Sequence, residues 1–318
     1  MPTMTHSFPS ARPVLSARDV GVRRYSRLTR EEGGSVRDQK EVHASVMVRE
    51  VLTALQPKDG EVVVDATFGI GGHSRALNAA AKIKLIALDA DSSTGVIEAN
   101  FADLEKVLKK LGIQKVDKVL FDLGWNATQL QSGRGFSFLR DEPLLMSYGK
   151  KPASHFTAAD ILNEWKEDTL ADVFFGYGEE RYARRIARAV VVRRKVQPIH
   201  TTIELVEIIR DATPAPYHHS RLHFATKTFQ ALRIATNDEL GVIERGLAAA
   251  WKRLSCQGRI AVITFHSIED RAVKKIFAAY TKEGGQLVYK KPLVPGSQEI
   301  KNNPRSRSAK LRVIERIC

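Results

Sequence analysis

The stretch "VVVDATFGIGGHS", residues 62–74, decides the fold class. Its three valines and Asp65 predict a buried β-strand, and the glycines that follow predict a tight turn leading into a helix over residues 74–81. The apolar run at residues 85–89 predicts the next strand. This alternation of strand, helix and strand predicts an α/β fold with a parallel sheet covered by helices.

The rest of the chain extends this pattern. We expect helices over residues 46–55 and through residues 274–280, strands at 118–122 and 259–265, and an antiparallel hairpin at the sheet edge formed by 286–290 and 310–316. Each of the predicted parallel strands ends in a polar group. These polar ends should therefore line up along one edge of the sheet.

Three regions differ in composition and pattern. Residues 1–40 contain eight Lys/Arg and four Asp/Glu with little hydrophobic periodicity, which predicts a disordered basic arm. The chain between residues 122 and 259 is far longer than a crossover requires. Its helical periodicity predicts a helical subdomain, residues 140–222, inserted into a domain made of residues 41–139 and 223–318. We expect this subdomain to serve in substrate recognition.

Composition and charge restrict the partners and the compartment. The 318-residue chain has a net charge of +14, which favours nucleic acid as a partner, although a merely basic surface is the alternative. No apolar run has the length of a membrane helix, so we expect a soluble protein. Cys256 and Cys318 are too few and too far apart in sequence for a disulfide framework. We expect the reducing cytoplasm, or the mitochondrial matrix if residues 1–40 act as a presequence.

The glycine-rich turn is suited to a nucleotide-like ligand, although an ordinary tight turn is the alternative. It holds Gly69, Gly71 and Gly72, whose backbone can approach a ligand and present N–H groups at a helix N-terminus. A dinucleotide fingerprint needs a further glycine where this chain has Ser74, which counts against a nicotinamide oxidoreductase. Asp89, at the tip of the second strand, can accept both hydroxyls of an adenosine ribose. Asp65 would lie near the ammonium group of a donor such as S-adenosylmethionine.

Basic residues form two candidate surfaces for RNA. Four arginines recur at helical spacing: Arg181, Arg184, Arg185 and Arg188. Such a stripe suits phosphate contacts, while the alternative is a solvated face balanced by Glu179 and Glu180. The second candidate surface is the run that contains Arg305, Arg307 and Lys310.

Nine motifs in register show a resemblance to a known family. The chain contains, in this order, "DATFGIGGHS", "ALDAD", "NFADL", "FDLGWNATQL", "RGFSF", "YGEERYARRIARAVV", "TFQALRIATNDEL", "ITFHSIEDRAVK" and "NPRSRSAKLRVIER". From about His43 onward it resembles the RsmH (MraW) family of S-adenosylmethionine-dependent small-subunit rRNA cytosine-N4 methyltransferases. The resemblance implies a class I (Rossmann-like) methyltransferase sheet with an inserted helical domain. It also implies S-adenosylmethionine as cofactor and a cytidine of the 16S decoding region as target, in naked rRNA or the assembled subunit; a homodimer is left open.

The resemblance also implies roles for individual residues. The family's donor-binding positions fall on Gly71, Gly72, His73, Asp89, Phe101, Asp122 and Gln129. The chain departs from the family in three places: a short segment after Asp91, Asn126 and Ala127 in place of two hydroxyl residues, and Leu145 and Ser147 in place of an acid and an arginine. These departures motivate a rival hypothesis, a ribosome-associated RNA-binding protein with a degenerate, non-catalytic donor pocket.

Methylation of cytosine N4 needs a hydrogen-bond acceptor, because the lone pair of this amine is delocalised into the ring. The amine must be held in line with the methyl group as its proton is drawn away. Asp122 is the best candidate for the acceptor and Asn126 a helper, although Asp122 could serve the cofactor alone. His266 has a role toward substrate or a structural one, and Ser267 with Asp270 suits a helix N-cap. No metal is required, and the histidines lack ligand spacing.

Overall fold

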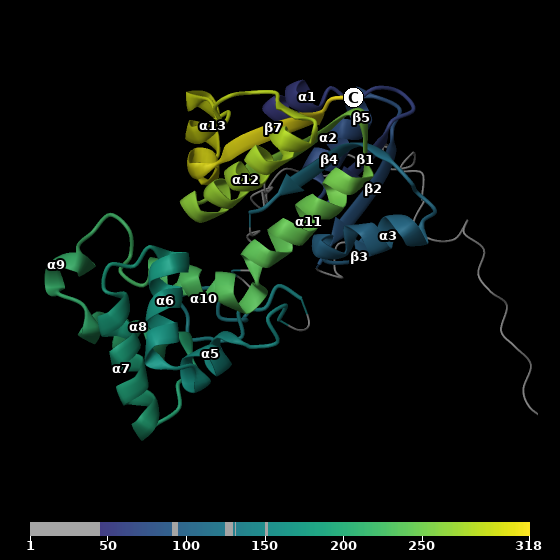
Figure 1. Cartoon of the computed structure of the whole chain (residues 1–318). Helices are drawn as coiled ribbons and strands as arrows, with labels where there is room; N and C mark the ends of the chain where they lie inside the picture. Colours follow the sequence, from purple (N-terminus) through teal and green to yellow (C-terminus); the bar gives the residue numbers. More distant parts are fainter. Residues whose placement is uncertain (1–44, 91–94, 125–129, 131, 150–151) are drawn as a thin grey trace, which may run out of the picture. The chain divides into compact units, whose positions relative to one another are not determined.

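The computed structural model describes residues 45–90, 95–124, 130, 132–149 and 152–318 (Figure 1). The predicted basic arm and the candidates Asn126 and Gln129 lie outside these ranges. Within these ranges, no helix combines the length and the apolar character that a bilayer crossing requires.

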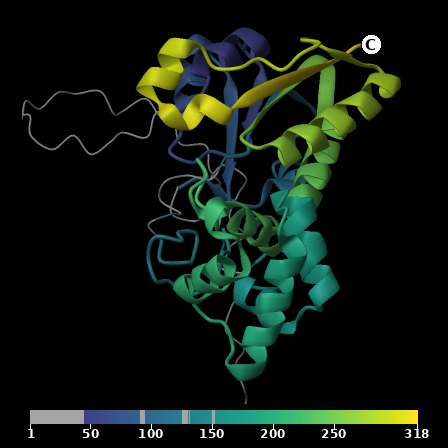
Figure 2. The same ribbon diagram turned by 90° about the vertical axis from the view of Figure 1, so that its left-hand side faces the viewer.

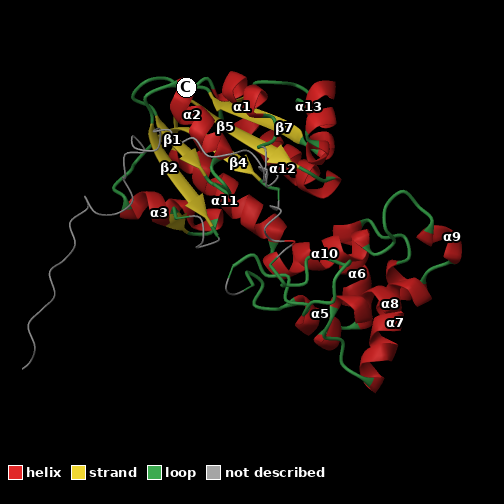
Figure 3. Cartoon of the chain, turned by 180° about the vertical axis from the view of Figure 1, so that it is seen from behind, coloured by secondary structure: helices red, strands yellow, loops and turns green. Residues whose placement is uncertain are grey.

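Seven strands form one sheet in the order β3-β2-β1-β4-β5-β7-β6 (Figure 3). They are β1 (Val62–Asp65), β2 (Lys84–Asp89), β3 (Ile97–Glu98), β4 (Val116–Asp122), β5 (Leu254–Thr264), β6 (Gly285–Leu287) and β7 (Lys310–Arg316). The first five strands pair in parallel, and β7 runs antiparallel to both of its neighbours. The strand order reverses between β1 and β4, and such a switch point is where open α/β sheets bind ligands.

Helices cover both faces of the sheet because successive strand residues point to opposite sides. Val63 and Leu120 pack on the face of α1 and α2, whereas Val64 and Phe121 pack on the face of α3, α11 and α12. The bounds are α1 (Val48–Leu55), α2 (Gly72–Ala80), α3 (Leu104–Lys110), α11 (Glu239–Arg253), α12 (Ser267–Tyr280) and α13 (Ser297–Asn302). Short 3-10 helices are η2 (Phe101–Asp103), η3 (Thr281–Glu283) and η4 (Pro304–Ser308). The predicted α/β layers are therefore present.

A separate helical cluster lies in sequence between β4 and β5, and its helices gather together in Figures 1 and 2. It consists of α5 (Ala158–Glu164), α6 (Glu167–Gly178), α7 (Ala183–Val196), α8 (Thr202–Ala212), α9 (Ala215–His218) and α10 (Thr226–Asn237). The cluster has its own core, in which Phe174 is fully buried. This core continues through Phe229 and Leu232 of α10, beyond the boundary at residue 222 expected from the sequence. The domain division itself stays a prediction.

The predicted edge hairpin takes a different form. β6 has only three residues and pairs antiparallel with β7, and residues 288–309 include α13 and η4. Pro292 and Pro295 lack the N–H that a strand ladder needs, so the chain after β6 does not continue as a regular strand along β7. The chain returns to β7 for one further bridge, between Leu293 and Leu311.

Cys256 and Cys318 form a disulfide, although their number and their separation in sequence predict no disulfide framework. Cys256 lies in β5 and Cys318 follows β7, and these two strands pair antiparallel with Arg259 opposite Glu315. The pairing brings the two Cα atoms to 5.7 Å despite a sequence separation of 62 residues. Sequence separation is therefore a poor guide to spatial separation at this end of the sheet.

Candidate functional site

Three aspartates stand at the carboxyl ends of neighbouring strands. Asp65 ends β1, Asp89 ends β2 and Asp122 ends β4. In the parallel register Asp65 lies beside Ala87 of β2 and beside Leu120 of β4, so the three tips meet at one edge of the sheet. The predicted alignment of polar strand ends is confirmed.

The glycine loop is fixed against the tip of β2. The Gly69 N–H donates to Oδ2 of Asp89 at 2.6 Å. Gly71 has φ 76°, and a Cβ there would collide with the ring of Phe68. The helix α2 begins at Gly72, two residues earlier than predicted, and its N-terminus therefore lies directly at the loop. The loop has the close backbone approach and free helix end that suit a nucleotide ligand.

Ser74 stabilises this loop through a hydrogen bond. Its hydroxyl donates to Oδ2 of Asp65 at 2.6 Å, and the N–H of Thr67 donates to Oδ1 of the same carboxylate. Burial raises the pKa of Asp65, while the hydrogen bond from Ser74 and the neighbouring His73 act in the opposite direction. Both oxygens of Asp65 thus hold the turn together. A serine here serves the loop where a dinucleotide fold would place glycine.

Asp122 and His73 face one another inside the site. Nδ1 of His73 lies 3.6 Å from Oδ2 of Asp122, and Nε2 lies 2.8 Å from the carbonyl oxygen of Val46. Because a carbonyl oxygen only accepts, Nε2 carries the proton and Nδ1 is turned toward Asp122. The backbone N–H of Asp122 donates to Oγ1 of Thr67. Oδ1 of Asp122 is buried and has no hydrogen-bond partner among the described residues.

The surroundings of Asp122 make it an unusually basic carboxylate. Its pKa is raised to about 6, mainly by burial and also by the charges of Asp65 and Glu269, while His73 and the Gly124 N–H oppose this increase. A carboxyl group of this kind is ionised at neutral pH and still accepts a proton more readily than an exposed aspartate. The combination of a perturbed pKa and an unpartnered oxygen marks Asp122 as a functional candidate.

Phe101 is packed between the sheet and α11. Its ring meets that of Phe121 edge-on, with centroids 5.4 Å apart, and leaves no room for a side chain at Gly246. The structure thus gives Phe101 a packing role while leaving it half-buried. Its contact with an adenine stays a prediction.

Comparison with known proteins decides the family. The model of the MraW methylase family matches residues 40–317. The chain belongs to the MraW methylase family. The methylase is 44% identical over 301 residues to ribosomal RNA small subunit methyltransferase H of Kosmotoga olearia, covering 88% of this chain and 99% of that one. It is 40% identical over 312 residues to the protein of that name from Rhodospirillum centenum, covering 88% and 93%.

Among solved structures, an rRNA methylase from Streptococcus thermophilus is 11% identical, with a TM-score of 0.38, and covers 85% of this chain and 94% of its own. Family membership confirms the predicted resemblance and the class I, Rossmann-like sheet with its antiparallel β7.

S-adenosylmethionine is the methyl donor of the methylase, as predicted. The residues present fit such a donor. The Gly71 and Gly72 backbone would cradle it, Asp89 at the end of β2 would bind its ribose, and Asp122 at the end of β4 would lie beside it. When bound, the donor supplies an activated methyl group, so that the protein's task is positioning and electrostatics.

His266 of the methylase is engaged in a buried ionic network. Its Nε2 lies 3.1 Å from Oε1 of Glu269 and 3.3 Å from Nη2 of Arg233. Burial opposes its charged form, but the carboxylates of Glu239 and Glu269 outweigh that cost and raise the pKa of His266 to about 9. The carboxylates of Glu269 and Glu239 thus favour a proton on Nε2. These contacts favour the structural role for His266.

The predicted cap of α12 is wrong by one residue. His266 is the N-cap: its Nδ1 accepts the N–H of Glu269, and the carboxylate of Glu269 accepts the N–H of His266. Imidazole nitrogen can replace a hydroxyl as this acceptor, which the serine-based signature overlooked. Ser267 instead donates to Glu179, and Asp270 binds Arg312.

The same network contains three side chains with the geometry of metal ligands. Ligand atoms of Glu239, His266 and Glu269 lie within 4.8 Å of one another. Nε of Arg233 lies 2.7 Å from Oε1 of Glu239, so that the guanidinium already supplies the cation this group requires. The cluster is explained without an ion.

The arginine stripe, which comprises Arg181, Arg184, Arg185 and Arg188, is exposed; the prediction of one helix is wrong for Arg181, which lies in the turn before α7, while the other three lie in α7. The two glutamates expected to balance it are used elsewhere. Glu179 binds Arg271 and Ser267 of α12, and Glu180 is fully buried. Within the described part of the chain, Arg188 pairs with Glu167 at 3.4 Å, and the other three arginines form no ion pair. The alternative of a charge-balanced face is disfavoured.

The second basic run divides into two parts. Arg305 and Arg307 are exposed on η4. Lys310 instead lies in β7 with its Nζ 3.2 Å from Oδ2 of Asp270, a carboxylate that Arg312 also binds. Lys310 therefore has part of its charge compensated within the fold, whereas Arg305 and Arg307 remain available for phosphate.

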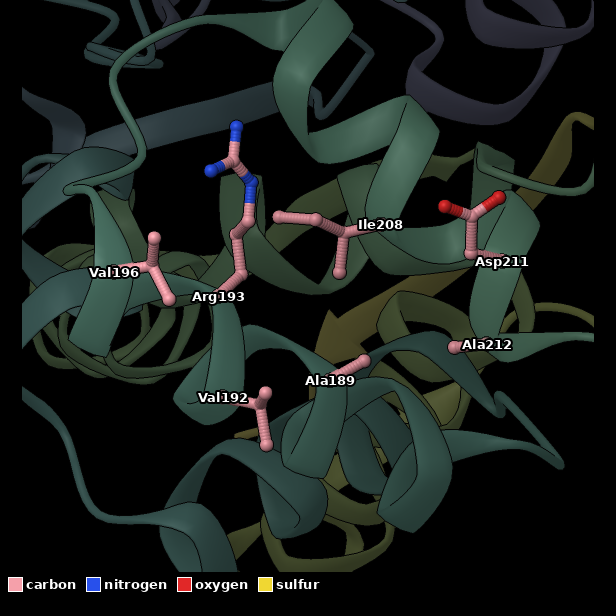
Figure 4. A pocket seen from close by; sticks show the side chains of 7 residues that line it. All are labelled: Ala189, Val192, Arg193, Val196, Ile208, Asp211 and Ala212. Atoms are coloured by element: carbon pink, nitrogen blue, oxygen red, sulfur yellow. The ribbon is translucent and has the colours of Figure 1, made fainter.

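A groove of about 360 Å³ lies between α7 and α8 (Figure 4). Its lining is mainly aliphatic and consists of Ala189, Val192, Arg193, Val196, Ile208, Asp211 and Ala212. None of these residues belongs to the strand ends, so this groove is separate from the candidate site.

Proposed function

We propose that the methylase transfers a methyl group from S-adenosylmethionine to the exocyclic N4 amine of a cytidine in the decoding region of small-subunit (16S) rRNA. The curated relatives carry the name ribosomal RNA small subunit methyltransferase H, and the ordered motifs resemble the cytosine-N4 enzymes. The observation that carries the proposal is the buried, unpartnered Oδ1 of Asp122 at the switch point of the sheet.

Asp122 is the proposed hydrogen-bond acceptor for the amine. As the nitrogen attacks, its N–H bonds become acidic, and an aligned carboxylate can take the proton. The raised pKa makes Asp122 a better acceptor than an ordinary aspartate, and its side chain is 22% exposed, so the proton can return to solvent. His73, held in place through Val46, lies with its Nδ1 3.6 Å from the second carboxylate oxygen. Asn126, the proposed helper, lies outside the described residues.

The basic surface supports an RNA substrate. Exposed arginines on α7 and η4 provide sequence-independent phosphate contacts, which supply affinity and position the strand. A base within a stack cannot reach a buried carboxylate, so the target cytidine must be unstacked or presented by an irregular junction. We place this activity in the cytoplasm, on naked rRNA or on the assembled subunit.

The rival function, RNA binding with a degenerate donor pocket, rests on the departures from the family pattern. Leu145 and Ser147 lie in the segment that leads into the helical cluster, where the hydroxyl of Ser147 donates to the Gly149 carbonyl at 2.6 Å. The segment after Asp91 gives β3 only two residues, paired with the end of β2. The chain nevertheless retains Asp65, Asp89 and Asp122 at the ends of their strands, which favours catalysis.

Two measurements on one preparation test the proposal. Calorimetry measures donor binding, and mapping of N4-methylcytidine in small-subunit rRNA, with and without the protein, measures transfer. Naked rRNA and assembled particles are compared as substrates. Transfer to one cytidine supports the proposal, and Asp122→Asn serves as the inactive control. Donor binding without transfer to either substrate would establish the rival function.

A further inference from the structure

An ordered cluster of arginine and tyrosine stands at the start of the arginine stripe. The guanidinium carbon of Arg181 lies 4.7 Å from the ring centroid of Tyr182 and 5.0 Å from that of Tyr217. The two rings meet at 71° with centroids 5.0 Å apart, and Arg185 lies 5.8 Å from the Tyr182 ring. We call Arg181, Tyr182 and Tyr217 the Arg–Tyr platform.

A buried glutamate holds this platform in place. Glu180 is fully buried, and its Oε2 accepts the hydroxyl of Tyr217 at 2.6 Å while its Oε1 accepts the N–H of Tyr182 at 2.8 Å. Burial and this carboxylate raise the pKa of the Tyr217 hydroxyl, which therefore stays protonated and donating. The rings are thus positioned before any ligand arrives, which lowers the entropic cost of binding one.

The chemistry of the platform suits unpaired RNA. Arg181 is exposed while it packs on two rings, and a guanidinium plane held in this way can stack on a base. The exposed Arg184 and Arg185 follow in the first turn of α7 and can contact phosphates. Stacking groups beside a row of cations are characteristic of surfaces for single-stranded nucleic acid. An acidic protein segment would use the cations but not the stacking plane.

The platform is connected to the edge of the sheet where the methyl-transfer site lies. Glu179, two residues before Arg181, binds Arg271 and Ser267 at the start of α12. That helix follows β5, whose residue Ile263 pairs with Asp122. The geometry points to the Arg–Tyr platform as a stacking site for an unpaired nucleotide that flanks the target cytidine. This inference rests on the proposed function.

Two variants separate stacking from charge. Arg181→Lys keeps the positive charge and removes the plane, and Tyr182→Leu removes the aromatic face. The probes are a fluorescently labelled, unstructured pyrimidine RNA and an abasic oligonucleotide of equal length, with binding measured by fluorescence anisotropy. Both variants should bind the RNA about tenfold more weakly, because stacking contributes to affinity for each base contacted. Binding to the abasic probe and the dependence of log Kd on log salt should not change.

Arg210→Lys is the matched control, since it makes the same substitution at an exposed arginine of α8 that lies outside the platform and the arginine stripe. It should bind both probes like the wild type. Thermal unfolding and donor binding of each variant show whether the fold is preserved. Equal RNA affinity of the wild type and both platform variants would overturn the inference, as would an equal loss on the two probes. Weaker binding to small-subunit particles with unchanged RNA affinity would identify a protein partner and also overturn it.

Failure of the inference differs from failure of the proposed function. If the wild type forms N4-methylcytidine and the platform variants bind RNA normally, only the platform is excluded. If the wild type binds RNA and discriminates between the two probes but transfers no methyl group, the platform stands and the proposed function fails.

Discussion

The strand-end aspartates and the arginine stripe differ in what surrounds their charges. Asp65 and Asp122 are enclosed by the sheet and the glycine loop, where burial raises the pKa of each carboxyl. Arg181, Arg184 and Arg185 are exposed, and the neighbouring glutamates are turned to other partners. The energy of a buried charge depends strongly on each of its contacts. In an exposed row of cations, the affinity for phosphates is distributed over several side chains. Single substitutions should therefore have large effects in the first region and small ones in the second.

The largest effect is expected for Asp122→Asn. Loss of the acceptor should lower the rate of methyl transfer by about 10²-fold or more, as measured by tritiated-methyl incorporation into rRNA. The same variant should unfold at a higher temperature at pH 8. Because the pKa of Asp122 is raised from 3.8 to about 6, keeping this group ionised in the folded state costs about 3 kcal/mol, and an amide avoids that cost. An active variant would leave Asp122 with a donor-binding role alone.

The pH dependence of transfer should follow the same carboxyl. The acceptor is the ionised form, so the rate should fall about tenfold for each pH unit below about 6 and level off above it. Because His73 lowers the pKa of Asp122, His73→Gln should move the midpoint to higher pH. Donor affinity measured over the same range separates catalysis from binding. A rate that is constant between pH 5 and 7 would contradict this assignment.

Asp89→Ala should weaken donor binding by roughly tenfold, the effect of removing one charge-assisted hydrogen bond. It also removes the acceptor for the Gly69 N–H. Asp103→Ala is the matched control, because Asp103 is an exposed aspartate that pairs with Lys106 on the surface. Calorimetry measures both affinities, and thermal unfolding checks the fold. An unchanged affinity in Asp89→Ala would exclude Asp89 from the ribose role.

The smallest effects should come from the stripe. Arg184→Ala should weaken RNA binding a few-fold and lower the slope of log Kd against log salt by about one. Arg188→Ala should change the affinity and the slope less, because Glu167, whose Oε1 lies 3.4 Å from Nε of Arg188, already compensates part of its charge. Charge reversal at both positions should exceed the sum of these small losses. Anisotropy titrations between low and moderate salt measure the slopes, and a wild-type slope in the double reversal would refute the phosphate contacts.

Local patterns predicted the parts of the molecule that depend on neighbours in sequence. The strand at residues 62–65 was predicted with the bounds that the structure shows. The position of Asp122 at a strand tip followed from an apolar run that ends in a carboxylate, because parallel strands present their ends at one edge. The predicted N-cap of α12 was wrong by one residue, because the capping signature favours serine over the imidazole of His266.

Local patterns could not predict contacts between segments that are distant in sequence. No spacing rule connects Tyr217 to Glu180, yet burial of that glutamate decides that the arginines are not balanced by it. The Val46 carbonyl that fixes His73 precedes the glycine loop by a whole helix and strand. The disulfide likewise depends on strand order, which becomes visible only when β5 and β7 pair. Tertiary pairing, and not residue type, determines these features.

The neighbour of β4 in the sheet is β5, and the whole helical cluster is synthesised between them. A ribosome making this chain therefore releases β1 to β4 first, with one edge of β4 unpaired. The cluster, which has local contacts and its own core, can fold during that interval. The edge of β4 stays unpaired until β5 and then β7 are synthesised and join the sheet. An unpaired strand edge is a template for aggregation. The delay between Asp122 and Leu254 is thus the period in which this chain most needs a chaperone or rapid elongation.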